Sequence, residues 1–221
     1  MTIAEQFAAL GLIVGLLALF ATWTRSQWPE AKELSRKVIH IGCGLLLPLS
    51  WYLGLPKNLA LAAAAVATVI VCINHRTRWL ALIEDVERKT YGTILYCLSI
   101  CCLIIFFWNS YPSAMLSGAL VMAISDGSAS LLGRLIPSPK WELYGQTKSM
   151  AGTSAMLLST LGIISVVQWS MGSGLSVAQI LFVSIFVTGL EQLSSYGLDN
   201  LSVPLATASL ISLVSESLKA T

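Results

Sequence analysis

A carboxylate, two glycines and an arginine follow one another closely near the middle of this chain. Asp126 closes an apolar run, Gly127 and Gly133 come after it, and Arg134 ends the segment. A carboxylate beside glycines can hold Mg²⁺ while a phosphate approaches the backbone, and arginine can bind that phosphate through two N–H groups. The segment therefore favours phosphate chemistry. The alternative is that Asp126 caps a helix, which aspartate often does.

A second group of ionisable side chains lies upstream and is mostly cationic. Arg36, Lys37 and His40 occur in one short stretch, and the four-residue spacing of Arg36 and His40 places them on one helix face. Two cations and an imidazole can bind a phosphate or an anionic headgroup. The alternative is ordinary anchoring at a membrane surface by basic residues. His40 favours a functional site, because it begins an apolar run where an ionisable group is costly.

A third group follows Tyr144 and precedes an apolar run. It combines a lysine, two hydroxyls and a glycine: Lys148, Ser149, Gly152 and Thr153. The group is not a P-loop, because that motif needs glycines where this chain has Glu142 and Thr147. Backbone N–H groups at the start of a helix nevertheless bind phosphate readily. The alternative is a capping and anchoring turn.

The fourth group places acids near the end of a late apolar run. Glu191 lies within the run, and Asp199 and Asn200 follow it. Such acids are costly in a membrane unless they are paired or bind a metal. Asp199 together with Asp126 would supply two carboxylates for Mg²⁺. The alternative for Glu191 is an ion pair between helices, with Arg134 or Lys148.

The composition is that of a membrane protein. The chain has 221 residues, of which 56% are hydrophobic and 11% charged, whereas soluble domains have about 25% charged residues. The mean hydropathy is +0.77. A net charge of +2 without a basic tail gives no indication of a nucleic-acid partner.

We expect one integral membrane domain over residues 1–221, an all-α polytopic transmembrane bundle of about seven to eight spans. The candidate spans are residues 3–23, 39–55, 58–73, 92–108, 112–125, 151–169, 176–197 and 202–218. Several are shorter than the roughly 20 residues that cross a bilayer, so we expect tilted, interrupted or half-buried helices.

The cations are strongly biased to one side of this topology. Apart from Lys57 and Lys219, all Lys and Arg residues lie in the three polar segments 24–40, 74–90 and 125–149. These segments follow the first, third and fifth spans and so share one side, which the positive-inside rule assigns to the cytoplasm, with both termini outside.

All four groups fall on this cytoplasmic side. Together they supply acids for Mg²⁺ and cations for phosphate, the combination that phosphoryl transfer requires because its catalysis is mostly positioning and charge neutralisation. An apolar bundle around such a site suits a lipid-soluble substrate. The sequence therefore predicts a lipid phosphotransferase with its site on the cytoplasmic face.

The ordered motifs resemble those of the CTP-dependent polyprenol kinases, a family that includes phytol kinase, dolichol kinase and CTP-dependent diacylglycerol kinase. The matching stretches are Arg36-Lys37-x-x-His40-x-x-x-Gly44, Asp126-Gly127-x-Ala129-x-x-x-Gly133-Arg134, Lys148-Ser149-x-x-Gly152-Thr153 and Asp199-Asn200-Leu201-Ser202-Val203-Pro204-Leu205. The compact size resembles the phytol kinase branch. Thr153 stands where the family usually has serine, and Ser202 where threonine is common, so both positions keep a hydroxyl.

The resemblance implies transfer of the γ-phosphate of CTP to the primary hydroxyl of an isoprenoid alcohol, with phytol the best candidate. Asp126 and Asp199 would hold Mg²⁺, with Asn200 assisting. Either His40 or Glu191 would orient or deprotonate the alcohol. Lys148 would be a catalytic cation at the triphosphate. The expected nucleotide-binding residues are Arg36, Lys37, Gly127, Gly133, Arg134, Ser149, Gly152 and Thr153.

Two other classes of protein remain open. One is a different lipid-phosphate enzyme, such as a diacylglycerol kinase, a phosphatidate cytidylyltransferase or a CDP-alcohol phosphotransferase. The last class needs further acids downstream, and none occurs between Asp126 and Glu142. The other is a small non-enzymatic transporter, but such proteins usually contain inverted repeats, and we find no internal repeat.

Overall fold

The structure is a computed structural model that describes residues 1–28, 32–77 and 91–219. Three cations of the second polar segment, Arg78, Arg88 and Lys89, lie outside these residues. The described elements in chain order are α1 (Ile3–Gln27), α2 (Lys32–Tyr52), α3 (Lys57–Thr77), α5 (Gly92–Phe107), α6 (Pro112–Leu120), the π-helical η1 (Val121–Ser125), α7 (Asp126–Leu135), β1 (Lys140–Leu143), β2 (Gln146–Ser149), α8 (Met150–Ser170), α9 (Val177–Leu193) and α10 (Asp199–Lys219).

The predicted all-α class is confirmed, and each of the eight predicted ranges contains a helix. The range 112–125 differs in length, because α6, η1 and α7 form one continuous helix from Pro112 to Leu135. Asp126 therefore lies inside a helix rather than at a free helix start. A two-stranded antiparallel hairpin, β1–β2, was not predicted.

Four of the described helices are long and apolar enough to cross a membrane: Ile3–Gln27, Lys57–Thr77, Pro112–Leu135 and Met150–Ser170. Two shorter apolar helices, α5 and α9, accompany them. Pro112–Leu135 is mostly buried and forms the centre of the bundle, whereas α1 packs on α2 at the edge and exposes large apolar side chains such as Phe20 and Trp23. Such a surface is expected where a helix faces lipid.

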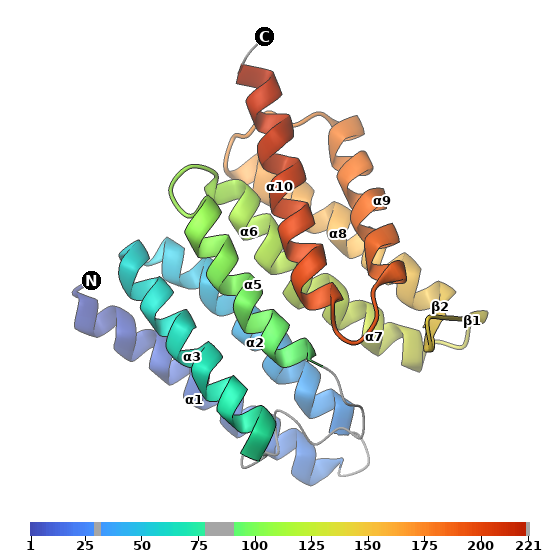
Figure 1. The fold of residues 1–221 in the computed structure, drawn as a ribbon, viewed down its shortest axis with the longest axis horizontal. Coiled ribbons are helices and arrows are strands. Elements are labelled where there is room, and N and C mark those ends of the chain that lie inside the picture. Colours follow the sequence, from blue (N-terminus) through green and yellow to red (C-terminus); the bar gives the residue numbers. More distant parts are fainter. Residues whose placement is uncertain (29–31, 78–90, 220–221) are drawn as a thin grey trace.

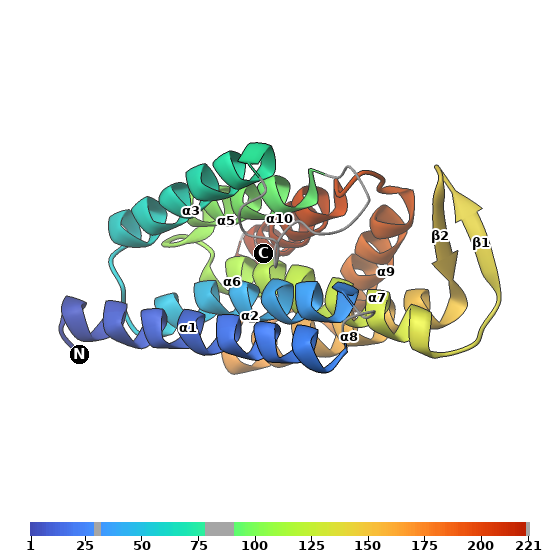
Figure 2. The ribbon, with the colours of Figure 1, turned by 90° about the horizontal axis from the view of Figure 1, so that it is seen from below.

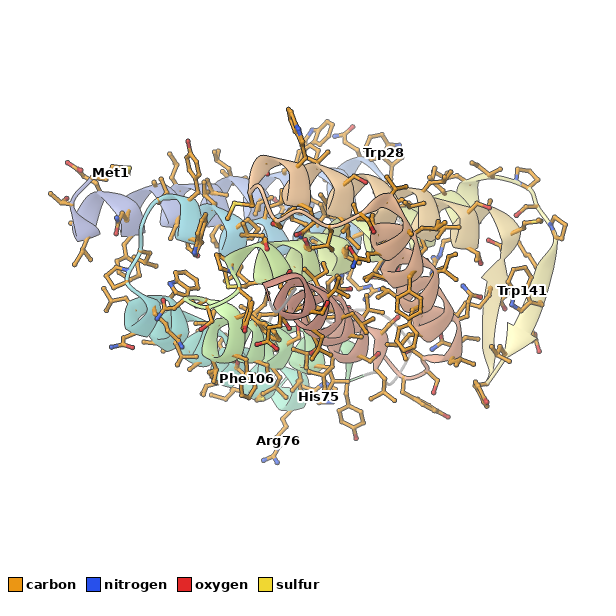
Figure 3. The ribbon with its side chains drawn as sticks, turned by 90° about the horizontal axis from the view of Figure 1, so that it is seen from above. Met1, Trp28, His75, Arg76, Phe106 and Trp141 are labelled. Atoms are coloured by element: carbon orange, nitrogen blue, oxygen red, sulfur yellow. The ribbon has the colours of Figure 1, made fainter. Side chains whose placement is uncertain are left out.

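The described parts of the polar segments lie at one end of the bundle. Figure 1 places the hairpin, the end of α7 and the connection between α9 and α10 at this end, while both termini and the connections α2–α3, α5–α6 and α8–α9 lie at the other. Side-chain positions agree, since Trp28 and Trp141 lie away from Met1 (Figure 3). We call the end that carries the hairpin and the connection between α9 and α10 the polar end. The hairpin projects beyond the helices there (Figure 2).

Helices α7 and α8 approach closely at two glycines. Gly133 and Gly152 face each other, and a Cβ on Gly152 would lie 2.9 Å from the carbonyl oxygen of Ala129 and 3.4 Å from the Cα of Gly133. The absence of both side chains lets α7 and α8 pack backbone to backbone. This contact fixes the helix that carries Asp126 against the helix that follows Lys148.

We expect Gly152→Ala to lower the melting temperature, because the added Cβ meets backbone atoms of α7, and overpacking of this kind costs about 1–3 kcal/mol. Gly162→Ala in the same helix is the matched control. Among the described residues, nothing lies within 4 Å of a Cβ at Gly162, and alanine favours helix over glycine. Thermal unfolding in detergent compares the two variants. Equal melting temperatures would contradict the close approach.

Candidate active site

Asp126 lies at the centre of a buried ionic cluster between α2 and α7. Lys37 Nζ donates to Asp126 Oδ2 at 2.8 Å, and His40 Nε2 lies 3.1 Å from the same oxygen. The three side chains are 4%, 9% and 13% exposed for Lys37, His40 and Asp126. The buried charges of Lys37 and Asp126 are tolerated because each is the other's partner. Two predicted nucleotide-binding or catalytic residues of α2 therefore contact the predicted metal-binding Asp126.

The orientation of His40 is set by further contacts. Its Nε2 also lies 3.0 Å from the carbonyl oxygen of Met122, and the Tyr96 ring packs on the imidazole with centroids 4.6 Å apart. Tyr96 Oη donates to the backbone carbonyl of His40 at 2.7 Å. Gly44, one turn further along α2, leaves the room that Tyr96 Oη and Ala123 occupy. The local sequence of α2 thus holds the imidazole against the central helix.

Lys148 reaches the site from the hairpin. Tyr144 and Gly145 both have positive φ, 48° and 72°, which gives the two-residue turn that matches the twist of a hairpin. Lys148 Nζ donates to Glu191 Oε1 at 2.5 Å and to the Glu191 carbonyl oxygen at 3.1 Å. Gln192 Nε2 donates to the other carboxylate oxygen at 2.6 Å. The ion pair expected as one alternative for Glu191 is therefore present, and both of its carboxylate oxygens are engaged.

Asp199 and Asn200 begin α10, just before the predicted span 202–218. Asp199 lies within electrostatic reach of Asp126, Lys37, Lys148 and Glu191. Burial first, and then the charge of Asp126, raise the pKa of Asp199 to about 6. Two carboxylates that disfavour each other's charge form an environment that a cation would stabilise. The predicted pair of acids is therefore brought to one place.

The remaining predicted residues fall into two groups. Arg36 contacts Glu33 twice, through Nε to Oε2 at 3.0 Å and through Nη2 to Oε1 at 2.5 Å. Arg134 is 59% exposed, and its Nη2 lies 3.8 Å from Glu33 Oε1. Gly127 packs against Ile41 of α2. These placements bring both arginines to the polar end, but assign Gly127 a packing contact.

The hydroxyls of the third motif serve the start of α8. Ser149 is the N-cap, since its Oγ accepts from the N–H of Gly152 at 3.2 Å and donates to the carbonyl of Gly133 at 3.3 Å. Thr153 Oγ1 donates to the Ser149 carbonyl at 3.0 Å. Ser149 therefore has the capping role that the sequence analysis gave as the alternative to phosphate binding. The cap holds the end of β2 so that Lys148 points to Glu191.

Known proteins place the chain in a family. No family model matches it, and no solved structure does. It is 36% identical over 180 residues to the phytol kinase of Synechocystis sp., which covers 80% of this chain and 77% of that protein. The chain belongs to the phytol kinase family. Plant members agree: a probable phytol kinase 1 of Glycine max is 31% identical, with 90% of this chain and 74% of that protein covered, and phytol kinase 1 of Arabidopsis thaliana is 29% identical, with 93% and 74% covered.

The acidic residues at the polar end are suitable ligands for a magnesium ion that would also bind a nucleotide phosphate. Among the described residues, no group of three or more His, Cys, Asp or Glu side chains can hold a metal alone. Mg²⁺ in phosphate sites, however, usually takes one or two carboxylates together with substrate phosphates and water. Asp126 and Asp199 would supply the carboxylates, and the buried Asn200 Oδ1 has no hydrogen-bond partner within the described chain. That oxygen is a suitable further ligand.

Three residues of this family member were missed as site residues. Glu33 holds Arg36, Gln192 holds Glu191, and Tyr96 holds His40. The spacing of Glu33 and Arg36, three residues apart on one helix, is a signal that could have identified the first. Nothing in the sequence identifies Tyr96, because its contact joins two helices far apart in the chain.

Proposed function

We propose that this protein is a kinase that transfers the γ-phosphate of CTP to the primary hydroxyl of an isoprenoid alcohol, with phytol as its substrate. The observation that carries the proposal is the convergence of Asp126, Lys148 and Asp199 at the polar end of an apolar bundle. The names of the relatives support a kinase that acts on phytol. CTP as the donor rests on the resemblance of the four motifs.

The cations at the polar end bind the triphosphate. Lys148, Arg36 and Arg134 neutralise its oxygens, and Lys37 fixes Asp126. Asp126, Asp199 and Asn200 would hold Mg²⁺, which would neutralise part of the negative charge of the triphosphate. Glu191 has both oxygens engaged by Lys148 and Gln192. We therefore assign Glu191 to positioning Lys148 and leave deprotonation of the alcohol to His40.

His40 accepts the proton of the alcohol in this mechanism. Both atoms facing its Nε2, Asp126 Oδ2 and the Met122 carbonyl oxygen, are acceptors, so the proton of the neutral ring belongs on Nε2 and Nδ1 is the basic nitrogen. The alcohol oxygen forms a bond to the γ-phosphorus, the bond from that phosphorus to the β–γ bridging oxygen breaks, and CDP leaves. The hydroxyl proton passes to His40.

The prenyl tail lies among the apolar helices, and the polar end faces the cytoplasm. Water-soluble nucleotide reaches the polar end, while a lipid alcohol reaches it from the bilayer. The bias of Lys and Arg to this end supports the cytoplasmic side. The names of the plant relatives assign those proteins to the chloroplast.

The test uses purified protein in detergent with Mg²⁺, each of the four γ-labelled nucleotides, and phytol, geranylgeraniol, dolichol or diacylglycerol. We expect label in phytyl phosphate, most strongly with CTP. Release of CMP or pyrophosphate would instead indicate a cytidylyltransferase or a CDP-alcohol phosphotransferase. Substrate flux into proteoliposomes without nucleotide would indicate a transporter.

We expect Asp199→Asn to raise the Mg²⁺ concentration needed for half-maximal activity by about tenfold or more, because even the loss of a residue that only supports a metal ligand typically weakens metal affinity by about 10–100-fold. Titration of Mg²⁺ at saturating nucleotide measures this. Glu142→Gln is the matched control, since it also removes one negative charge but from an exposed strand position. An unchanged Mg²⁺ requirement in Asp199→Asn would remove this residue from the metal site.

A further inference from the structure

Glu33 contacts two arginines that come from different helices. It lies in the first turn of α2, where it is paired with Arg36 through both carboxylate oxygens. Its Oε1 also lies 3.8 Å from Nη2 of Arg134 on α7, and Ser130 Oγ donates to the same oxygen at 3.4 Å. One carboxylate therefore joins a cation of α2 to a cation of α7.

The three side chains differ in how far they are exposed to solvent, and Glu33 is the most buried of them. The side chains of Glu33, Arg36 and Arg134 are 13%, 31% and 59% exposed. The carboxylate is thus the innermost group, and an anion approaching from water meets the guanidinium groups before it meets Glu33. The unit of two arginines and one glutamate keeps a net positive charge, which suits a phosphate.

The same unit lies beside the carboxylates that we assign to the metal. Arg36 is within electrostatic reach of Asp126 and Asp199. A phosphate held by Arg36 and Arg134 would therefore lie near the metal-bound part of the same nucleotide. Burial works to raise the pKa of Glu33, but Arg36, Arg134 and Lys37 together lower it below its usual value, so Glu33 remains ionised at neutral pH.

Resting on the proposed function, we infer that Glu33 is a positioning residue that draws Arg36 and Arg134 together into a two-arginine clamp for the phosphates of the nucleotide. Without the carboxylate, the two guanidinium groups repel each other, and Arg134 turns into solvent. Binding must then order a long and flexible side chain, which costs rotamer entropy.

The test compares Glu33→Gln, Glu33→Asp and the exposed control Glu142→Gln in the full-length protein. Equilibrium binding of the Mg²⁺ complexes of CTP and of inorganic triphosphate is measured for each, together with KM for both substrates and the melting temperature. We expect Glu33→Gln to weaken CTP and inorganic triphosphate by the same factor of about ten, with KM for the alcohol and the melting temperature nearly unchanged. Glu33→Asp restores part of the affinity, and Glu142→Gln binds like the unaltered protein.

Three results would overturn the clamp. Unchanged triphosphate binding in Glu33→Gln would show that the arginines do not depend on Glu33. Tighter binding would show that Glu33 competes with the phosphate. Loss of affinity for both substrates in proportion to a fall in melting temperature would show a structural ion pair only. Because binding is measured without turnover, a protein that binds nucleotide but phosphorylates no alcohol would refute the proposed function and leave the clamp tested. A protein that binds neither triphosphate would refute both.

Discussion

Asp126→Asn is expected to lower turnover by about 10³-fold or more, since it removes a charge placed at the phosphoryl-transfer site. The structure adds a second consequence. Lys37 is only 4% exposed and donates to Asp126 Oδ2, and removal of one partner of a buried ion pair costs about 3–5 kcal/mol. Turnover of labelled CTP and thermal unfolding must therefore be measured together.

A double variant separates the two effects of this change. Lys37→Met with Asp126→Asn removes the unpaired buried charge, so it recovers stability relative to Asp126→Asn but not turnover. Recovery of turnover in the double variant would show that the single variant was inactive through misfolding. Turnover close to that of the unaltered protein in Asp126→Asn alone would remove this carboxylate from the mechanism.

Lys148→Met is expected to lower kcat/KM for the nucleotide by about 10²–10³-fold, the usual effect of removing one group that stabilises developing charge. The change also leaves Glu191, which is 8% exposed, without its cation. Steady-state kinetics with varied CTP and varied alcohol measure the loss. We expect the KM for the alcohol to change little, because Lys148 acts on the phosphates.

Glu191→Gln decides between the two roles expected for that residue. If Glu191 only positions Lys148, the Glu191→Gln variant should lose only about tenfold in turnover. The double variant of Lys148→Met with Glu191→Gln should then be more stable than Lys148→Met alone. As the base that deprotonates the alcohol, Glu191 would be essential. A loss in Glu191→Gln as large as that in Lys148→Met would contradict the positioning role and return the proton transfer to Glu191.

The helices could be predicted because a long apolar run that crosses a membrane forms a helix, which satisfies its backbone hydrogen bonds internally. Each run between polar segments folds into a helix, and alternation of the spans was enough to place Asp126, Lys148 and Asp199 at one end. The length of the central helix was harder to predict from the sequence. Its continuation from Pro112 through Asp126 to Leu135 depends on packing against α2, α8 and α10, which buries polar residues that look like a loop in the sequence.

The pairings were not predictable. Lys37 and Asp126 are 89 residues apart, and Lys148 and Glu191 are 43 apart. Spacing along one helix cannot indicate such contacts, and the 13 Lys and Arg residues and 11 Asp and Glu residues of the chain allow many pairings. The hairpin was missed because its strands have four residues each, too few for a clear alternation. Its turn at Tyr144 and Gly145 was the only local signal.

The ion pairs of the polar end have a consequence for how a donor is taken up. Arg36 and Arg134 share Glu33, Lys37 holds Asp126, and Lys148 holds Glu191. When Asp199 is counted with these groups, their charges nearly cancel over the whole site, and the net positive charge is confined to the arginine pair around Glu33. A metal–nucleotide complex carries both signs of charge. Its phosphates would replace carboxylates as partners of the cations, and its metal would replace an ammonium group as the partner of a carboxylate.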